Sequence, residues 1–479
     1  MSLWFAQHGS GAAPDPADQA MAEARAAIQA KDYQRAVGAC TRAVEARPDW
    51  AEAFYWRAVA QMFLRNDEPG IADFSTAIRL DPKEERYYVD RAAAYMGLRG
   101  REAEAIQDLS TALALKPGSY PARYNRGIAY YQMGEFDRSI RDFSDLMAAF
   151  PSDPMNLAAR RNRAVVYGAQ GLHEKAIEEL DEVLRVDPRN GLARLNRVAQ
   201  FLENGDVEKA LVDSEVFVEQ FPESSEAYCA RGAAYLAKRD YDKALPDFDK
   251  ALFLEPKSAK AQYFRAMTHA KLGRQAAAIR DFTAAIALDD HYVAAYRGRA
   301  GALETSGEVD AAVADLDHAI ALGPKDWRSW SVRGQFRFRR GQFHLAVSDF
   351  SKAAELDVTR DGLPYRQVWL FLARERAGRD GKADLAAFRK SREGGDWPVP
   401  VIDMFLGTTS VADCLGAAKD ADAQRDKEKK CEAFYFVGEL HILAGERKQG
   451  VEFFQKCIDT GLSGFIEYEG AKAELDRLK

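Results

Sequence analysis

The stretch RYNRGIAYYQMGEFDRSIRDFSDLMAAFP, residues 123–151, decides the fold of this chain. Its apolar residues recur at i, i+3 and i+4 on both sides of a Gly-containing turn, which is the spacing of two short amphipathic helices. Two charges fall on the stripe that should be buried, because Arg126 lies beside Gly127 and Asp142 lies beside Phe143. A fold that explains the helices must also explain these opposite charges.

The same pattern recurs along most of the chain. The second helix of each repeat is followed by a stop residue at intervals of 34 to 37 residues: Pro48, Pro82, Pro117, Pro151, Pro188, Pro222, Pro256, Asp290, Pro324 and Val358. Most repeats also carry a small residue at the eighth place and a large one at the twenty-fourth, such as Gly127 and Phe143. A fixed period of about 34 residues, made of helix, turn and helix, is typical of a stacked helical-hairpin solenoid.

This pattern resembles the tetratricopeptide repeat family. The resemblance implies an all-α, right-handed solenoid, or superhelix, with ten tandem repeats over residues 17–358. We expect a flexible tail at 1–16, degenerate helical repeats over 359–430, and a final repeat-like hairpin with a capping helix over 431–479. A solenoid needs such a cap because its last repeat would otherwise expose apolar surface.

The opposite charges recur with the repeats. Nine consecutive repeats carry an Arg at the seventh place and an acid at the twenty-third: Arg57 and Asp73, Arg91 and Asp108, Arg126 and Asp142, Arg163 and Glu179, Arg197 and Asp213, Arg231 and Asp247, Arg265 and Asp281, Arg299 and Asp315, Arg333 and Asp349. Two antiparallel helices joined by a tight turn bring these places within reach, so we expect an ion-pair ladder.

The spacing leaves open whether each Arg pairs with the acid of its own repeat or of the one before. The first repeat has Glu23 and Ala39 in these places, and this joint absence favours pairing within a repeat. A catalytic or ligand-binding ladder is the alternative, but chemistry takes place at one site and this feature occurs nine times. We therefore expect the charges to be part of the scaffold.

Composition excludes several functional classes. The 479 residues are 47% hydrophobic and carry a net charge of −7, which argues against general nucleic-acid binding because that needs a basic face. No apolar run approaches the roughly 18 residues of a membrane-spanning helix, and the N-terminus does not resemble a signal peptide. We expect a cytoplasmic protein, or a periplasmic one if a leader has been removed, with no membrane and no nucleic-acid partner.

Cysteine and histidine show no arrangement typical of catalysis or metal binding. The five cysteines, Cys40, Cys229, Cys414, Cys431 and Cys457, have no CxxC spacing, and the seven histidines are scattered. No phosphate loop or nucleophile elbow stands apart from the repeats. We therefore predict no catalytic residue, no metal ligand and no cofactor. The alternative is a regulatory subunit or enzyme whose active site lies in residues 359–479.

The C-terminal section carries a second resemblance. Residues 397–407 and 434–445 resemble the C-terminal section of bacterial tetratricopeptide proteins related to the NlpI lipoprotein. Members of that group are adaptors that present substrates or hydrolases to one another, so the resemblance implies a bacterial adaptor. The lack of a lipobox and the longer array argue against a role in the cell envelope.

Function in such arrays is expected on the concave wall. Places 2, 6, 9 and 13 form one stripe of the first helix, with places 5 and 12 beside it. Early repeats put Tyr55, Met62, Phe63, Ile128 and Tyr131 there, whereas late repeats put Lys271, Arg297, Arg328 and Arg339 there. The alternatives are that the aromatic residues fill space within repeats and that the arginines form a solvated face. RNA binding through the interleaved Arg and Phe of 327–344 is disfavoured by the acidic chain.

Three consecutive repeats carry Asn at the sixth place: Asn125, Asn162 and Asn196. An amide offers a donor and an acceptor, so it can hold the main chain of an extended peptide. The series resembles the asparagine ladder that lines the tetratricopeptide superhelix of O-GlcNAc transferase, although a plain exposed Asn is the alternative. The Lys and Asn pairing of the chaperone-binding carboxylate clamp does not occur here.

Together these patterns predict a non-catalytic protein–protein interaction scaffold, or adaptor. It would bind an extended peptide or a partner protein in its concave groove, with the apolar end of the peptide at the early repeats and the acidic end at the late ones. The identity of the partner and the oligomeric state stay open.

Overall fold

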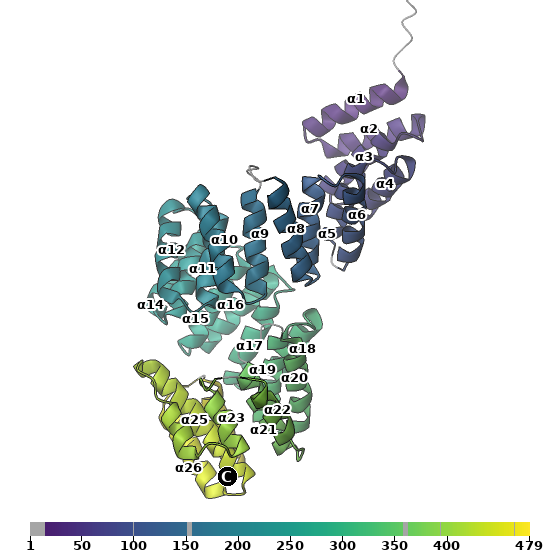
Figure 1. The fold of residues 1–479 in the computed structure, drawn as a ribbon. Coiled ribbons are helices and arrows are strands. Elements are labelled where there is room, and N and C mark those ends of the chain that lie inside the picture. The colour runs from purple at the N-terminus through teal and green to yellow at the C-terminus, as the bar shows by residue number, and fades with distance from the viewer. Residues whose placement is uncertain (1–14, 99, 151–155, 358–362, 393, 464) are drawn as a thin grey trace, which may run out of the picture. The chain divides into compact units, whose positions relative to one another are not determined.

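The computed structural model describes residues 15–98, 100–150, 156–357, 363–392, 394–463 and 465–479. The flexible tail expected at 1–16 lies outside them up to residue 14, as do the expected helix stops Pro151 and Val358. Every element of the described residues is an α-helix, so the chain is the all-α solenoid that its period predicts (Figure 1). It divides into two compact units, Met1–Asn196 and Arg197–Lys479, with the boundary inside α11 (Gly191–Glu203).

The first unit is a row of helical hairpins. Its helices before α11 are α1 (Pro16–Gln29), α2 (Tyr33–Ala46), α3 (Ala51–Phe63), α4 (Asp67–Leu80), α5 (Glu85–Met96), α6 (Glu102–Leu115), α7 (Tyr120–Gln132), α8 (Phe136–Ala149), α9 (Asn156–Ala169) and α10 (His173–Val186). From α1 to α10, each odd-numbered helix packs against the helix that follows it, and each of α2, α4, α6 and α8 packs against the first helix of the next hairpin. One hairpin corresponds to one repeat of the sequence.

The second unit continues with the same hairpins. They comprise α12 (Val207–Gln220), α13 (Ser225–Ala237), α14 (Tyr241–Leu254), α15 (Ala259–Lys271), α16 (Gln275–Leu288), α17 (Val293–Thr305), α18 (Val309–Leu322), α19 (Trp327–Arg339) and α20 (Phe343–Leu356). A C-terminal block follows, made of α21 (Leu363–Arg376), α22 (Lys382–Lys390), α23 (Val399–Leu406), α24 (Val411–Ala417), α25 (Ala423–Leu443), α26 (Arg447–Asp459) and α27 (Ile466–Arg477).

Local sequence sets where the helices stop and turn. The second helix α4 ends at Leu80, two residues before Pro82, because a proline ring cannot continue the hydrogen-bonded helix. The turn inside a hairpin needs one residue with left-handed backbone, and Gly134 supplies it after α7 with φ 77°. Arg239 takes the equivalent place after α13 with φ 63°, a conformation that a residue with a Cβ adopts at a cost.

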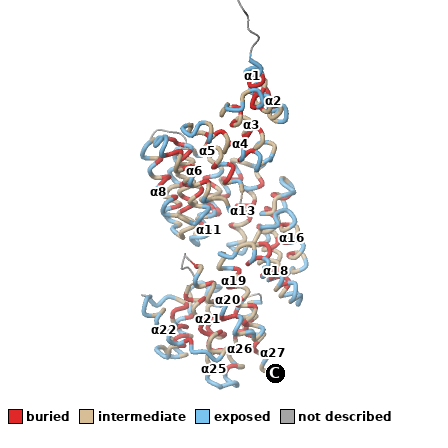
Figure 2. The backbone as a smooth tube through the Cα atoms, turned by 90° about the vertical axis from the view of Figure 1, so that its right-hand side faces the viewer, coloured by how far each residue is buried: buried red, intermediate tan, exposed pale blue. Residues whose placement is uncertain are grey.

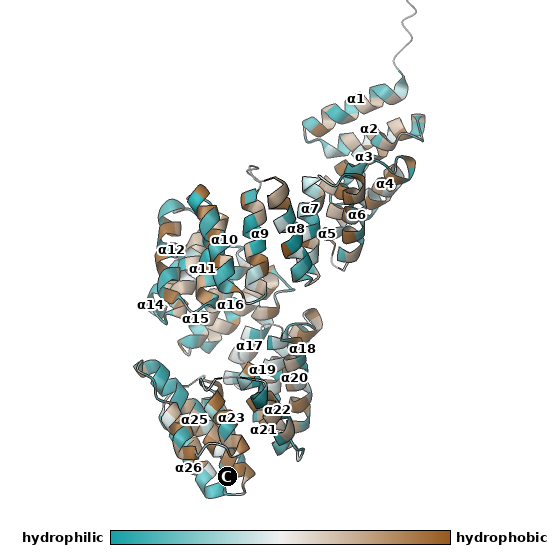
Figure 3. Cartoon of the chain, viewed as in Figure 1, coloured by the Kyte–Doolittle hydropathy of each residue, from teal (hydrophilic) through white to brown (hydrophobic). Residues whose placement is uncertain are grey.

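Small and large residues interlock inside each hairpin. A Cβ added to Gly127 would lie 2.9 Å from the ring of Phe143, and one added to Gly232 would lie 2.7 Å from the ring of Phe248. The eighth place is therefore small because the aromatic ring at the twenty-fourth fills the space beside it. Buried residues accordingly occur in every hairpin (Figure 2), and most helices carry hydrophobic and hydrophilic residues side by side (Figure 3).

The expected ion-pair ladder is present, and each Arg pairs with the acid of its own repeat. In eight of the nine pairs the guanidinium donates through two nitrogens to the two carboxylate oxygens, as between Arg126 and Asp142 at 2.8 Å each. Arg163 donates to Glu179 through one nitrogen. Pairs occur in all nine repeats: Arg57–Asp73, Arg91–Asp108, Arg126–Asp142, Arg163–Glu179, Arg197–Asp213, Arg231–Asp247, Arg265–Asp281, Arg299–Asp315 and Arg333–Asp349. The two charges in the opening stretch thus neutralise each other within one hairpin.

The ladder also connects neighbouring repeats, which its spacing did not predict. The third guanidinium nitrogen of Arg91 donates to the hydroxyl of Ser75 in the preceding repeat at 2.9 Å. The same nitrogen of Arg333 donates to the carboxylate of Asp317 in its preceding repeat at 2.6 Å. One side chain therefore holds its own hairpin closed and fixes the register between two hairpins.

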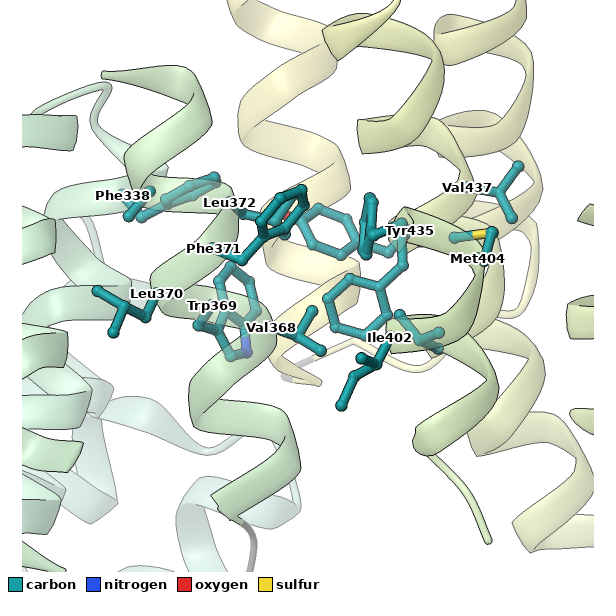
Figure 4. Packing of buried hydrophobic residues seen from close by; sticks show 14 of the residues in the cluster. Phe338, Val368, Trp369, Leu370, Phe371, Leu372, Ile402, Met404, Tyr435 and Val437 are labelled. Atoms are coloured by element: carbon teal, nitrogen blue, oxygen red, sulfur yellow. The ribbon is translucent and has the colours of Figure 1, made fainter. Parts of the chain in front are cut away.

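The C-terminal block shares one large core with the last repeat. Phe338 of α19, Trp369 of α21 and Tyr435 of α25 pack together, and Ile402 and Met404 of α23 belong to the same cluster (Figure 4). The final hairpin expected over 431–479 begins at Ala423, as the 21-residue helix α25. Helix α27 packs against α25 and α26, and it also contacts α19.

Candidate partner-binding surfaces

The first helices of the repeats form the inner wall of each unit. Helices α1 and α3, α5 and α7, and α7 and α9 contact one another directly in the first unit. Helices α13 and α15, α15 and α17, and α17 and α19 do so in the second. In the described part of the chain no contact of similar extent joins neighbouring second helices. The first helices thus lie on the more tightly packed side, where the predicted groove residues are found.

Two of the predicted apolar groove residues pack inside the first unit. Tyr55 is 7% exposed, and its hydroxyl donates to the carboxylate of Asp90 in the next repeat at 2.7 Å. Burial, and then the charge of Asp90, raise the pKa of the Tyr55 hydroxyl. Met62 packs beside Gly70 of its own hairpin. These contacts favour the alternative that these two residues fill space within and between repeats.

Other apolar residues of the first unit remain accessible. Phe63 is 61% exposed, and its ring stacks on Tyr33 with centroids 4.4 Å apart. Tyr131 is half-buried beside Phe136, and Ile128 is half-buried in the same cluster. A ligand can reach Phe63 more readily than Tyr55.

The three asparagines lie on α7, α9 and α11, as consecutive first helices. Asn125 and Asn196 are half-buried. Asn162 is also half-buried, but its amide donates to the hydroxyl of Tyr124 in the preceding repeat at 2.9 Å. The middle member of the series therefore already joins two repeats.

Two of the four predicted cations of the second unit form ion pairs with acids. Arg297 pairs with Asp326 at 2.6 Å, and Arg339 pairs with Glu304 at 2.7 Å. Arg328 is exposed, and its guanidinium lies 4.7 Å from the ring centre of Trp327. Ion pairs therefore neutralise much of the positive charge that the sequence places on the late repeats.

The Arg-rich stretch 327–344 is largely structural. Arg333 belongs to the ladder, and Arg337 donates to the same carboxylate, that of Asp349, at 2.7 Å. Acids from other parts of the second unit thus compensate several of its five arginines.

A pocket that the sequence did not predict opens on the inner wall of α13, α15 and α17. Its volume is about 530 Å³. Met267, Gly298 and Gly301 contribute to its floor. Its other lining residues are Leu236, Ala237, Arg239, Tyr241, Ala270, Lys271, Gln275, Phe282, Ala302, Thr305, Glu428, Gly461, Leu462, Ser463 and Phe465. Of the predicted site residues, Lys271 lines this pocket.

The C-terminal block forms the opposite side of the pocket, which we name the roof. The roof consists of Glu428 on α25 and the lining residues of the segment 461–465, between α26 and α27. The signal that could have located the floor is the pair of glycines, Gly298 and Gly301, at the sixth and ninth places of one repeat. Nothing in the sequence period predicts the roof.

Charges stand at the edge of the pocket. Arg239 forms an ion pair with Glu428 of the roof. Loss of hydration, and then the nearby Arg239, lower the pKa of Lys271, while Glu428 opposes this change. Lys271 is exposed to solvent. Two cations and one acid therefore leave an excess of one positive charge.

Buried polar groups hold the C-terminal block together. Arg376 of α21 pairs with Glu439 of α25 at 2.7 Å and with Glu474 of α27 at 2.9 Å. Burial, and then the charge of Glu474, raise the pKa of Glu439 to about 7. Glu432 accepts hydrogen bonds from the hydroxyl of Tyr365 and the indole of Trp397. These groups join helices that are far apart in the sequence.

The match to known families agrees with the period and with the hairpins. Tetratricopeptide repeat models match residues 225–258 in one form and 21–68, 124–190, 164–225, 266–326 and 298–361 in another. These matches together cover more than half of the chain. The chain belongs to the tetratricopeptide repeat family.

Several known proteins resemble parts of this tetratricopeptide repeat protein. The lipoprotein NlpI homolog of Haemophilus influenzae is 25% identical over 150 residues, which cover 31% of this chain and 47% of that protein. Serine/threonine-protein phosphatase 5 of Rattus norvegicus is 30% identical over 128 residues, 26% of this chain and 25% of that protein. The chain thus matches less than half the length of either relative.

A tetratricopeptide repeat protein from Parabacteroides merdae has a similar solved structure. It is 24% identical, with a TM-score of 0.43, and the likeness covers 53% of this chain and 98% of that one.

Within the described residues of the present protein, no helix is both long and apolar enough to cross a membrane.

Proposed function

We propose that this protein is a non-catalytic scaffold that binds an extended segment of a partner protein on the inner walls of its repeats. Membership of the tetratricopeptide repeat family supports a role in protein–protein interaction. The observation that carries the proposal is that different side chains of the first helices stabilise the fold and face the groove. The arginines at the seventh place form the ion pairs of the ladder. The places of the first helices that are expected to face the groove carry half-buried or exposed side chains and line a pocket.

In the first unit, the surface proposed for the partner comprises Phe63, Asn125, Ile128, Tyr131 and Asn196. These residues are half-buried or exposed on first helices, so a partner can reach them without disturbing a hairpin. Tyr55 and Asn162 support this surface through hydrogen bonds between repeats, and Met62 supports it by packing within its own hairpin.

In the second unit, the proposed surface comprises Lys271, Arg328 and the pocket. Arg297 and Arg339 contribute less to the attraction of an acidic partner because Asp326 and Glu304 already neutralise them. The acidic end of a bound segment is therefore expected near Lys271.

We also propose that the protein acts as an adaptor in a bacterial cytoplasm. All five cysteines are free and buried, which suits a reducing compartment. The resemblance to the NlpI homolog supports a bacterial adaptor. The alternative, an enzyme or regulatory subunit with an active site in residues 359–479, would have to use groups outside the buried Arg376 network.

Site-specific photo-cross-linking in the native cell tests the proposal. A photoreactive amino acid placed at Asn125, Asn196 or Arg328 should capture the same partner protein. Matched positions on second helices, Val186 and Phe253, are 57% and 76% exposed and should capture little. Capture from the second helices alone would overturn the proposed surface.

A further inference from the structure

We propose that the pocket beneath the roof binds one extended segment of the partner protein that carries an apolar side chain next to an acidic one. The apolar side chain would lie against Gly301, and the carboxylate would meet Lys271. This inference rests on the proposed scaffold function, because it names the chemistry of the segment that the second unit receives.

The floor of the pocket leaves room for a side chain. A Cβ added to Gly301 would meet no atom within 4 Å, whereas one added to Gly298 would lie 2.5 Å from the ring of Phe282. Gly298 is therefore glycine because of packing, but packing does not explain Gly301. Glycine in the middle of α17 destabilises the helix relative to residues with a side chain. No packing contact requires a glycine at position 301.

The pocket that Gly301 lines has apolar residues on the repeats and on the roof. Met267 and Phe282 belong to the repeats, and Leu462 and Phe465 belong to the roof. An apolar side chain placed against these residues would lose part of its contact with water, which favours binding in proportion to the area buried. Apolar binding alone, however, does not distinguish one partner from another.

Charge supplies that distinction. Arg239 is held by Glu428, which leaves Lys271 as the excess cation at the pocket. A carboxylate that approached Lys271 would gain a charge-assisted hydrogen bond and would relieve its repulsion from Arg239. An acidic side chain therefore complements the pocket better than a basic or neutral one.

The shape of the site favours an extended chain over a small molecule. The pocket touches three successive first helices, and packed helices are about 8–10 Å apart. Crossing them takes roughly six residues of extended polypeptide at about 3.3 Å each. Lys271 and Gly301 lie on neighbouring first helices, so adjacent or nearly adjacent side chains of one segment can reach both.

The roof is tied to the repeats and can hold such a segment in place. Arg477 at the end of α27 donates to the main-chain carbonyl of Arg339 at 2.7 Å, which anchors the helix after the roof segment to α19. The pair between Arg239 and Glu428 ties the other side. The pocket is thus built jointly by the repeats and the C-terminal block.

A random dodecapeptide library displayed on phage, selected on the full chain, provides the test. Selected sequences are made as fluorescent peptides, and their affinity is measured for the wild type, Gly301→Trp and Lys271→Glu. A Cβ at 301 meets no atom within 4 Å, so we expect a tryptophan there to occupy the pocket. Two matched controls are Gly416→Trp, at an exposed helical glycine with open space around its Cβ, and Lys325→Glu, at an exposed lysine outside the pocket.

We expect the selected peptides to share an acidic residue beside a large apolar one. Both pocket variants should bind them at least about tenfold more weakly, which is the loss expected for one charge-assisted contact or one buried side chain. The controls should bind like the wild type, and the loss in Lys271→Glu should shrink at high salt.

Peptides without acidic residues, or equal binding to Gly301→Trp, would overturn the inference. So would a selection that enriches no peptide while Gly301→Trp changes the sedimentation of the protein, because the pocket would then serve a contact between two copies. In either case cross-links from Asn125 and Asn196 can still support the scaffold function, so the two proposals fail separately.

Discussion

The repeat array and the C-terminal block both use buried ion pairs, but they build them differently. In the array each pair joins two helices of one hairpin, with partners such as Arg197 and Asp213 separated by 16 residues. In the block one arginine, Arg376, joins acids that are 63 and 98 residues away. The array therefore distributes its ion pairs over nine similar sites within hairpins, whereas in the block one arginine links three helices that are far apart in the sequence.

Replacing Arg376 should destabilise the C-terminal block and have the largest effect of the substitutions described here. Arg376→Met would leave Glu439, at 0% side-chain exposure, without its charged partner, whereas Glu474 would keep its ion pair with Arg477. Stripping a buried charge of its partner costs about 3–5 kcal/mol. Urea unfolding and limited proteolysis should show a destabilised C-terminal block with an intact array. An unchanged unfolding midpoint would contradict this role of Arg376.

Removing one member of the ladder should have a smaller effect. Arg197→Met leaves Asp213 without its bidentate partner, and hydrogen bonds to charged groups contribute about 1.5–3 kcal/mol. We expect proteolytic cleavage near α11 and α12, with partner binding reduced only as far as folding is. Arg185→Met is the control, because the pair of Arg185 with Glu182 is exposed and should contribute little. Equal stability of the two variants would mean that the ladder arginine is solvated.

The two regions should also respond differently to pH. The pKa of Glu439 is raised in the folded block to about 7 from 4.5, so its contribution to stability is complete below 4.5 and is lost as pH rises through 7. Between pH 6 and 8 this group alone should cost the block roughly 1 kcal/mol. Glu439→Gln should flatten the profile of the unfolding midpoint over this range. An identical slope in both proteins would assign the pH dependence to another group.

These differences explain which parts of the molecule the sequence could predict. A period of about 34 residues repeats the same local geometry, so the hairpins, the small-to-large packing and the partners of the ladder follow from spacing. Contacts such as that of Arg376 with Glu474 have no period, and only the three-dimensional path of the chain brings them together. The roof of the pocket is of this second kind.

The predicted groove residues show a second limit of what the sequence can predict. A stripe on a helix tells which side chains face inward, but not whether a neighbouring repeat reaches them first. Tyr55 is long enough to bond Asp90 of the next repeat, and Asn162 reaches back to Tyr124. Glycines such as Gly301 proved more informative about open space than the large residues, because a missing side chain in a helix needs an explanation.

The third guanidinium nitrogen of the ladder arginines, which donates to the preceding repeat, bears on how the number of repeats can change. For seven of the ladder arginines this nitrogen donates to a hydroxyl or a carboxylate in the preceding repeat: Thr41, Ser75, Ser110, Ser144, Asp249, Thr283 or Asp317. If a gene duplication inserted one repeat in register, or a deletion excised one, the guanidinium at the new junction would meet an acceptor of the same kind. These seven junctions are therefore interchangeable in this contact, and the number of repeats can change by one hairpin at any of them while the contact is kept.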